Sequence, residues 1–385
     1  MIQRDIAPYI QALATQYPVI TITGPRQSGK TTLCKTLFKE KQYINLESLQ
    51  TREFALSDPI GLIKSIPDGA IIDEIQYAPQ LLSEIQVRVD EIKKPGQFIL
   101  TGSNQLSLST KISQSLAGRT AVATLLPFTI QEARQMMREK SPFEWLYYGF
   151  YPRIYDSKLN PTQALDFYMQ TYIERDIRQL SNIHQLSTFQ KFVKLCATRV
   201  GQLVNLSEIG NEIGISHSTV RDWLTILQAS YIIFLLEPFS VNISKRLIKT
   251  PKLYFYDVGL AAYLLGIEQV AHVDSHPLKG ALFENMIISE KLKNRFNIGK
   301  NQNMYFYRDS SGLEIDLIYP DGSKWCVIEI KSSQTINSHF FKNILNFEKL
   351  FPEFISEKYL IYAGDQNQKR SNGIQVVSAD FCLPK

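Results

Sequence analysis

The chain has 385 residues, 44% of them hydrophobic and 21% charged, and its formal net charge is +5. This composition excludes a disordered protein, and the length exceeds what one hydrophobic core usually supports, so more than one domain is expected. The four cysteines have neither C-x-x-C nor zinc spacing, and no apolar segment is long enough to cross a bilayer. We therefore expect a cytoplasmic protein with no membrane partner, whose small positive charge permits nucleic acid as a partner without requiring it.

A phosphate-binding loop is the first motif along the chain. The β-branched run at residues 19–23 predicts a buried strand, and the sequence GPRQSGKTT follows it directly. This sequence matches G-x-x-x-x-G-K-[ST], in which backbone N–H groups and a lysine bind phosphates and a hydroxyl binds Mg²⁺. Lys30 is the predicted catalytic cation, and Thr31 is a predicted Mg²⁺ ligand. The predicted nucleotide-contacting residues are Gly24, Pro25, Arg26, Gln27, Ser28, Gly29, Lys30, Thr31 and Thr32.

Two adjacent carboxylates end the next predicted apolar strand, at residues 69–75 (GAIIDEI). A carboxylate at the end of a buried parallel strand can reach the Mg²⁺ that Thr31 binds, and its neighbour can orient or deprotonate the attacking water. We therefore predict Asp73 as the metal residue and Glu74 as the catalytic residue. The alternative is a strand that simply leaves the core through two acidic residues.

Small polar residues follow a third predicted strand at residues 97–101. At a strand end beside the γ-phosphate, Asn104 or Ser103 would sense that phosphate by hydrogen bonding. Glycine, serine and asparagine also form ordinary turns, so a simple turn remains the alternative.

Arg119 precedes the last apolar strand of this region, at residues 121–126. An arginine commonly stabilises the negative charge that develops on a transferring phosphoryl group. The same chain or a neighbouring chain can supply this arginine. Arg119 is the candidate for this catalytic role, and action on a neighbour would imply a homo-oligomer. A surface salt bridge is the alternative.

The strands predicted near residues 18–23, 43–46, 70–74, 97–101 and 120–126 indicate a parallel α/β sheet with helices on both faces. We expect residues 1–130 to form a P-loop ATPase domain. ATP is preferred over GTP because no N/T-K-x-D base-reading motif follows the loop. Hydrolysis is preferred over transfer to an acceptor because Glu74 directly follows Asp73.

The middle of the chain predicts helices. Residues 131–200 are expected to form a helical connector or lid, and residues 201–275 a winged helix-turn-helix. The helix-turn-helix has its turn at Gly214 and an N-cap at Ser216, with wing strands near 231–236 and 253–256. Its second helix has little positive charge on its exposed positions, so a protein-contact or structural role is favoured over DNA binding.

Residues 276–385 alternate helices and strands around a set of acidic residues. Glu284 lies on the first predicted helix, Asp316 on a strand, and Glu329 with Lys331 on the next strand. In order and residue type this region resembles the restriction-endonuclease-like PD-(D/E)xK fold. The resemblance implies a Mg²⁺ site formed by Glu284, Asp316 and Glu329, with Lys331 near the attacking water.

This prediction depends on the register of the hairpin that joins the two strands. A two-residue loop at Asp321-Gly322 pairs Asp316 with Val327, and the period of two then places Asp316, Glu329 and Lys331 on one face. A three-residue loop without a bulge would send Glu329 to the other face. The alternative is a solvated hairpin on which glutamate and lysine are ordinary surface residues.

Taken together, the chain resembles the prokaryotic AAA-type ATP-binding proteins that carry a C-terminal domain of unknown function. The resemblance implies an ATPase joined to a winged helix and a nuclease-like domain. The matching segments are residues 24–32 (GPRQSGKTT), 71–76 (IIDEIQ), 100–103 (LTGS), 117–119 (AGR), 172–176 (YIERD), 254–260 (YFYDVGL) and the set from 283 to 331.

The expected function is that of a Mg²⁺-dependent ATPase whose nucleotide state controls a C-terminal module that binds or processes nucleic acid. A second hypothesis is an ATP-driven switch or adaptor whose C-terminal domain binds a protein partner without catalysis. A transcriptional regulator that uses the helix-turn-helix ranks third, because that helix is weakly charged.

Overall fold

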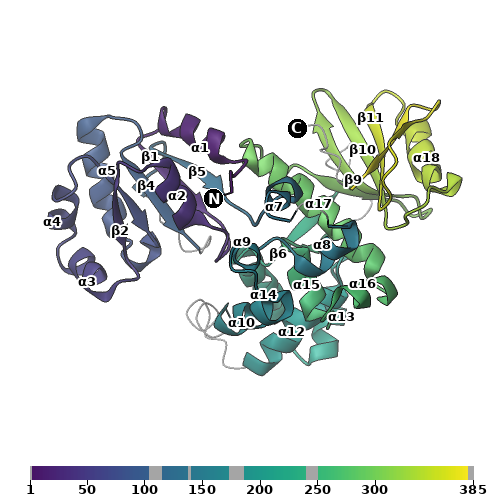
Figure 1. Cartoon of the computed structure of the whole chain (residues 1–385), viewed down its shortest axis with the longest axis horizontal. Helices are drawn as coiled ribbons and strands as arrows, with labels where there is room; N and C mark the ends of the chain where they lie inside the picture. The colour runs from purple at the N-terminus through teal and green to yellow at the C-terminus, as the bar shows by residue number, and fades with distance from the viewer. Residues whose placement is uncertain (1, 104–114, 138–139, 173–185, 240–249, 380–385) are drawn as a thin grey trace. The chain divides into compact units, whose positions relative to one another are not determined.

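The chain folds into two compact units. Figure 1 is drawn from a computed structural model, which describes residues 2–103, 115–137, 140–172, 186–239 and 250–379. Unit 1 contains Met1–Phe128 and the short segments Ala229–Tyr231 and Lys293–Asn301. Unit 2 contains Thr129–Gln228, Ile232–Leu292 and Gln302–Lys385. Among the described residues, no helix combines the length and the apolar character that a membrane span requires.

Unit 1 has a five-stranded parallel sheet in the order β2-β3-β4-β1-β5. This finding confirms the predicted parallel α/β fold. Because parallel strands end at one edge of the sheet, the segments after β1, β3 and β4 meet at that edge. The strands are β1 (Val19–Thr23), β2 (Gln42–Asn45), β3 (Ala70–Asp73), β4 (Phe98–Gly102) and β5 (Thr120–Thr124).

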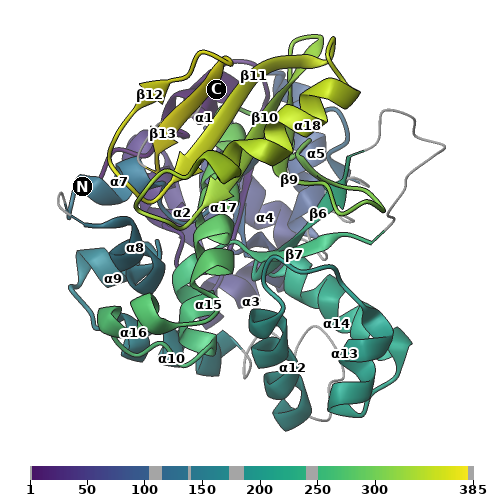
Figure 2. The same cartoon turned by 90° about the vertical axis from the view of Figure 1, so that its right-hand side faces the viewer.

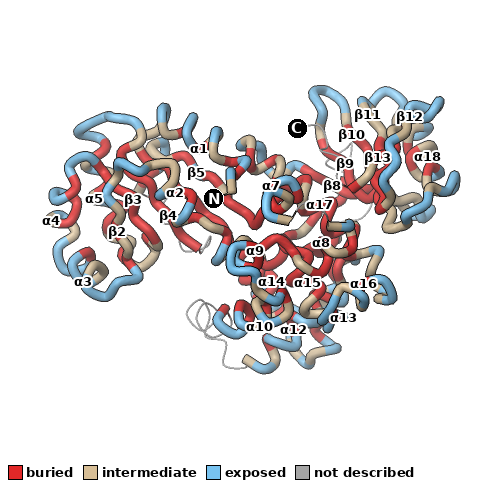
Figure 3. The backbone as a smooth tube through the Cα atoms, in the orientation of Figure 1, coloured by how far each residue is buried: buried red, intermediate tan, exposed pale blue. Residues whose placement is uncertain are grey.

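Helices cover both faces of this sheet, as alternation along the strands requires. Ile72 and Leu100 face a core formed with α3 (Leu49–Ser57), α4 (Pro59–Lys64) and α5 (Leu81–Ile92). Their strand neighbours Ile71 and Ile99 face the opposite core, which contains α1 (Ala7–Ala14) and α2 (Lys30–Leu37). Figure 3 shows the central strands β1, β3 and β4 as buried segments, whereas the edge strands β2 and β5 are only partly buried.

Unit 2 begins with helices, as predicted. Two of them follow one another through a short turn: Gly214 (φ 80°) ends the first, and the Ser216 hydroxyl accepts a hydrogen bond from the Thr219 N–H at the start of the second. The helices are α7 (Ile130–Arg134), α8 (Pro142–Tyr148), α9 (Pro152–Asp156), α10 (Pro161–Tyr172), α12 (Leu186–Thr198), α13 (Leu206–Ile213), α14 (His217–Ala229), α15 (Val258–Leu264), α16 (Val270–Ser275), α17 (Lys279–Asn297) and α18 (Lys342–Leu350).

The strands expected as a separate wing join a larger sheet. β6 (Ile233–Pro238) pairs antiparallel with β7 (Lys252–Phe255) and parallel with β8 (Tyr305–Arg308). The eight strands follow the order β12-β13-β11-β10-β9-β8-β6-β7. The remaining strands are β9 (Glu314–Asp321), β10 (Lys324–Lys331), β11 (Ile355–Tyr362), β12 (Gln368–Lys369) and β13 (Ile374–Ser378).

Helix α18 packs on strands β9 and β10 through Ile344 and Phe347, which are both buried (Figure 2). The central strands β9 and β10 are buried over most of their length. The β9–β10 hairpin is therefore part of the core of unit 2 and is no solvated surface ribbon.

The register of this hairpin differs from the predicted one. Asp321 pairs with Lys324 and Leu317 with Ile328, so the two-residue loop is Gly322-Ser323. Gly322 has a φ of 61° while Asp321 does not have a positive φ, which fits a turn with glycine at its first central position. The predicted pairing of Asp316 with Val327 is therefore wrong by two residues. A shift of two keeps the face of each side chain, so Asp316, Glu329 and Lys331 still share one face.

Candidate functional site

The backbone of the phosphate-binding loop has the conformation that its glycines allow. Gly24 has a φ of 143°, and a Cβ atom there would lie 2.1 Å from the Leu125 carbonyl oxygen. Gly29 has a φ of 90° and precedes the first residue of α2, Lys30. Both conformations are unfavourable for residues with a side chain, so the sequence requires glycine at these two positions.

Lys30 lies across the loop and is 6% exposed. Its ammonium group donates hydrogen bonds to the carbonyl oxygens of Gly24 (3.0 Å) and Pro25 (2.8 Å). Burial lowers the pKa of Lys30, although the carboxylates of Glu74 and Asp73 oppose this effect. In the described part of the chain Lys30 forms no ion pair, and its direct hydrogen-bond partners are two neutral carbonyl groups. A buried cation of this kind is well placed to receive an anion.

Asp73 ends strand β3 and accepts hydrogen bonds from three hydroxyl groups. Thr31 donates to Oδ2 at 2.8 Å and Tyr43 donates to the same oxygen at 2.6 Å, while Thr101 donates to Oδ1. The Thr31 contact joins the phosphate-binding loop to the end of β3. The structure thus brings together the two residues that we predicted as Mg²⁺ ligands in unit 1.

Glu74 has a left-handed backbone (φ 58°, ψ 51°), which is uncommon for a residue other than glycine. Its N–H donates to the Thr101 hydroxyl at 3.2 Å, and its carboxylate accepts from Ser103 at 3.2 Å and from Gln76. Ser103, one of the two sensor candidates, therefore contacts the predicted catalytic carboxylate. The other candidate, Asn104, lies outside the described residues. No role was predicted for Gln76, although it ends the matching segment 71–76 (IIDEIQ).

Arg119 is not brought to this site. Its backbone carbonyl accepts from Val19 at the start of β1, so Arg119 lies at the sheet edge opposite the phosphate-binding loop. Its guanidinium forms two hydrogen bonds with the Asp90 carboxylate, at 2.6 and 2.8 Å. The expectation of a catalytic role within its own chain is therefore wrong, and the surface salt bridge is found instead. Arg26, within the loop, approaches Glu47 at 4.0 Å.

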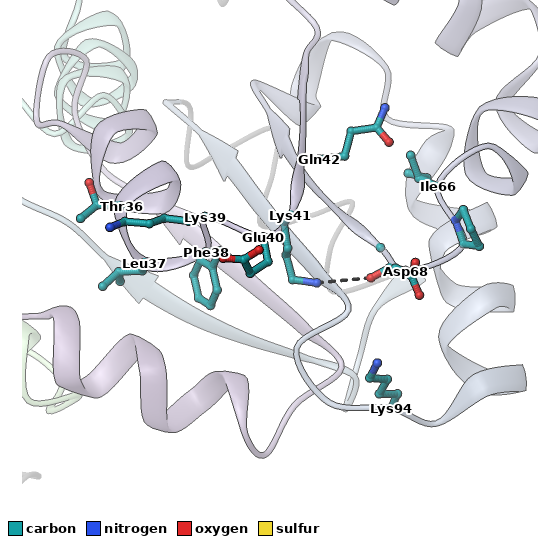
Figure 4. A pocket seen from close by; sticks show the side chains of 12 residues that line it. Thr36, Leu37, Phe38, Lys39, Glu40, Lys41, Gln42, Ile66, Asp68 and Lys94 are labelled. Atoms are coloured by element: carbon teal, nitrogen blue, oxygen red, sulfur yellow. Dashed lines mark hydrogen bonds between the residues drawn. The ribbon is translucent and has the colours of Figure 1, made fainter.

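A pocket of about 750 Å³ lies at the same opposite edge of the sheet, before strands β2 and β3. Figure 4 shows Lys41 directed toward Asp68, whose carbonyl oxygen accepts its hydrogen bond at 3.4 Å. The pocket is lined by Thr36 to Gln42, Ile66 to Gly69, and Lys94. None of the predicted nucleotide-contacting residues lines it, so it is separate from the loop.

In unit 2, Asp316, Glu329 and Lys331 are in contact. The Lys331 ammonium group lies 2.7 Å from Glu329 and 3.7 Å from Asp316. Asp316 accepts a hydrogen bond from the Ile330 N–H at 2.7 Å, and Asn343 donates to Glu329 Oε1 at 3.1 Å. Glu329 Oε2 is buried and has no hydrogen-bond partner in the structure. Burial, together with the nearby Asp316 carboxylate, raises the pKa of Glu329 to about 8.

Glu284 belongs to a neighbouring network around Lys252, which is 3% exposed. Lys252 pairs with Glu314 and, at 3.3 Å, with Glu284, while the Tyr254 hydroxyl donates to Glu284. Burial raises the pKa of Glu284 to about 7. Within the described residues, no three metal-binding side chains converge. Lys252 and Tyr254 contact the Glu284 carboxylate, whereas Asp316 and Glu329 contact Lys331, so a metal site completed by Glu284 stays a prediction. Sequence reasoning assigned no role to Lys252 or Tyr254, although Tyr254 lies in the matching segment 254–260.

Comparison with known families assigns the N-terminal region. Residues 16–134 match the family described as AAA domain. Residues 139–271 and 279–382 match two domains of unknown function, DUF8612 and DUF4143. The first match and the parallel sheet together make residues 16–134 an AAA-type domain of the P-loop ATPase class, a fold that implies nucleotide binding.

The chain is similar to uncharacterized proteins of Mycobacterium tuberculosis and Mycobacterium bovis. Each is 27% identical over 386 residues, which cover 99% of this chain and 84% of the mycobacterial protein. Among solved structures, a Walker-type ATPase of Pyrococcus abyssi has a TM-score of 0.48 at 15% identity, over 69% of this chain and 96% of that one. AMPPCP-bound DnaA from Aquifex aeolicus has a TM-score of 0.29 at 14% identity, over 58% and 85%.

Proposed function

We propose that unit 1 hydrolyses ATP with the help of Mg²⁺, and that its nucleotide state controls unit 2. The observation that carries the first part is the 2.8 Å hydrogen bond from Thr31 to Asp73. This bond places the phosphate-binding loop next to the end of strand β3, which Glu74 directly follows. A nucleotide in the loop would therefore have its phosphates beside both a metal-binding pair and a catalytic carboxylate.

The residues at this position suit Mg²⁺. Asp73 is 5% exposed, and its carboxylate accepts hydrogen bonds from the hydroxyl groups of Thr31, Tyr43 and Thr101. Oxygen ligands of this kind are what Mg²⁺ prefers, and it binds through one or two protein groups together with phosphate oxygens. Thr31 and Asp73 would hold the ion, which when bound neutralises charge on the β- and γ-phosphates.

The side chains of the site have separate roles in this proposal. Lys30 and the loop N–H groups bind the phosphates, and the burial of Lys30 strengthens that attraction by excluding water. Glu74 orients the attacking water and accepts its proton. Ser103 and Gln76 hold the Glu74 carboxylate, so the position of the base depends on the end of strand β4.

The variant Glu74→Gln tests the assignment of the base. We expect calorimetry to give wild-type affinity for ATP, because the amide keeps the shape of the side chain. Phosphate release should fall by about 10²–10⁴-fold, the usual contribution of a general base. Glu53→Gln, at an exposed glutamate on α3, is the matched control and should hydrolyse ATP like the wild type. Unchanged turnover in Glu74→Gln would remove Glu74 from the mechanism.

We also propose unit 2 as a module that processes nucleic acid, on one specific observation. Asp316 and Glu329 lie on one face with Lys331, and Glu329 Oε2 is buried without a partner. Two carboxylates with an unused oxygen suit a cation that keeps most of its own water ligands. Asp316 and Glu329 would hold such an ion, which when bound activates a water molecule for phosphodiester cleavage.

Asp316→Ala tests this second function. Mg²⁺-dependent cutting of DNA or RNA should disappear in this variant while ATP hydrolysis remains. Asp321→Ala, at the exposed end of the same strand, is the matched control and should keep both activities. Cutting that survives in Asp316→Ala would place the chemistry elsewhere. If the wild type neither cuts nucleic acid nor binds Mn²⁺ in calorimetry at this pair, unit 2 acts as a binding-only adaptor.

A comparison of ATP hydrolysis with single-stranded DNA, duplex DNA and RNA tests the control of unit 2. We expect one of these ligands to tighten ATP binding, and so to stimulate hydrolysis at ATP concentrations below the KM, because coupling between two sites is reciprocal in binding free energy. Stimulation would identify the class of partner. No response to any of the three would favour a protein partner.

A further inference from the structure

We infer that Arg4, at the N-terminal end of unit 1, positions the phosphate-binding loop by fixing the peptide bond between Ser28 and Gly29. This inference rests on the proposed nucleotide site and adds a residue that belongs to none of its motifs. Arg4 precedes helix α1 and is distant in sequence from the loop.

The contacts of Arg4 are short and buried. The residue is only 7% exposed. Its Nη1 donates to the Ser28 carbonyl oxygen at 2.7 Å, and its Nη2 donates to the Leu126 carbonyl oxygen at 2.7 Å. The guanidinium also lies over the Phe128 ring, 4.9 Å from its centroid. Charged donors make stronger hydrogen bonds than neutral ones, and the planar fork of arginine fixes both acceptors at once.

The contact with Ser28 sets the direction of the next N–H group. In a trans peptide the C=O and the following N–H point in opposite directions, and the described chain has no cis peptide bonds. Because the Ser28 carbonyl points toward Arg4, the Gly29 N–H points away from Arg4. The N–H groups of this loop are the ones expected to cradle phosphate, so Arg4 orients one of them before a nucleotide arrives.

Two further observations support a positioning role. Arg4 Nη1 lies 3.5 Å from where a Cβ atom of Gly29 would be, so the guanidinium packs directly against this part of the loop. The Ser28 side chain is fully buried and its hydroxyl has no hydrogen-bond partner in the structure. Ser28 therefore does not hold its own peptide in place through its side chain.

The segment after strand β5 supports the loop at both ends. At the first end, the Leu125 carbonyl oxygen packs against Gly24, where no Cβ atom would fit. At the second end, the Leu126 carbonyl oxygen is joined to Ser28 through Arg4. The loop is thus held in its binding conformation without a ligand, which reduces the ordering that binding must otherwise bring about.

Nucleotide affinity tests the inference more directly than turnover does. We expect Arg4→Met to raise the Kd for ADP in calorimetry, and the KM for ATP, by about tenfold or more, with kcat changed by less than about threefold. The reason is that a correctly oriented N–H group binds phosphate in the ground state and in the transition state alike. Arg4→Lys should give an intermediate Kd, since one ammonium group cannot replace the two-pronged contact.

Arg52→Met is the matched control. The Arg52 guanidinium also donates to two backbone carbonyls, those of Leu46 and Glu47, and lies over the Tyr77 ring, but it does not touch the loop. This variant should lose a similar set of contacts in unit 1 and keep wild-type affinity for ADP. Equal losses of affinity in Arg4→Met and Arg52→Met would mean a general effect on unit 1 and would overturn the inference.

A folded Arg4→Met protein that binds ADP like the wild type, or one that loses only kcat, would also overturn it. If Arg4→Met does not fold, the Arg4→Lys variant decides, and wild-type affinity in that variant counts against the inference. Binding of ADP does not require hydrolysis. A wild type that binds ADP but does not hydrolyse ATP would therefore contradict the proposed ATPase and leave the role of Arg4 to be decided by its own variants.

Discussion

Lys30 in unit 1 and Lys252 in unit 2 are both buried, and their surroundings differ. Lys30 in unit 1 donates to two backbone carbonyls, and burial lowers its pKa. Burial also disfavours the charge of Lys252 in unit 2, but the carboxylates of Glu284, Asp316 and Glu314 outweigh it and raise the pKa. The comparison teaches that a buried cation balanced by carboxylates serves the fold, whereas one held by neutral dipoles is available to an anionic ligand.

The carboxylates show the same difference. Asp73 is surrounded by hydroxyl donors, which can rotate and exchange partners when an ion arrives. Asp316 and Glu329 share Lys331, and their closeness makes the second negative charge costly. The Asp73 carboxylate is thus held by neutral hydroxyl groups, whereas Asp316 and Glu329 are held by a charged side chain.

The largest effect that this comparison predicts is on stability. Lys252→Met should destabilise unit 2 by about 3–5 kcal/mol, because it leaves two carboxylates without their buried partner. Lys30→Met should cost unit 1 only about 1 kcal/mol, because only hydrogen bonds to carbonyls are lost. Trp145, Trp223 and Trp325 all lie in unit 2, so tryptophan fluorescence in urea follows that unit alone. Circular dichroism follows the unfolding of both units. Equal losses of unfolding free energy in Lys252→Met and Lys30→Met would contradict the comparison.

The next largest effect concerns Tyr43 on strand β2, whose hydroxyl donates a hydrogen bond to Asp73. Tyr43→Phe removes one of the hydrogen bonds to Oδ2, and we expect the Mg²⁺ requirement for nucleotide binding to rise by about 10–100-fold. A Mg²⁺ titration of ATP binding, followed by calorimetry, measures this change. Tyr9→Phe, at a tyrosine on α1 that packs against Gly299, is the control and should leave the requirement unaltered. An unchanged Mg²⁺ requirement in Tyr43→Phe would show that Asp73 does not depend on this contact.

These variants also separate the features that the sequence could predict from those that it could not. The loop, the two carboxylates after β3 and the parallel strands follow from local spacing, since each motif lies on one strand end. Tyr43, Arg4 and Lys252 reach their partners across the fold, so no local pattern indicates them. The face shared by Asp316 and Glu329 was predictable from the period of two. The register was not, because Asp321-Gly322 and Gly322-Ser323 are both acceptable two-residue turns.

A smaller effect depends on pH. The folded pKa of Glu329, about 8, lies above its ordinary value of 4.5, so the protonated form favours folding. That stabilisation is present below the ordinary value and is lost as the pH rises through about 8. Glu329→Gln stays neutral, so its Tm should rise relative to the wild type between pH 6 and pH 9. A Tm difference that does not change with pH would mean that Glu329 is already ionised at pH 6.

The smallest expected effect is at Arg119. Arg119→Met breaks an exposed pair with Asp90 and should leave kcat and KM for ATP within about twofold of the wild type, because exposed salt bridges contribute little. Steady-state kinetics at several protein concentrations measures this. A loss of hydrolysis that depends on protein concentration would instead assign Arg119 to the site of a second copy of the chain.

The central claim is that unit 1 binds a nucleotide through the free charge of Lys30, and one calorimetric titration tests it most directly. Wild-type protein in millimolar Mg²⁺ is titrated with ATP, beside Lys30→Met protein shown to be folded by circular dichroism. We predict one binding site in the wild type and no measurable binding in the variant, since the loop loses the buried cation that lies across it. No heat of binding in the wild type, or equal affinity in the two proteins, would contradict the account.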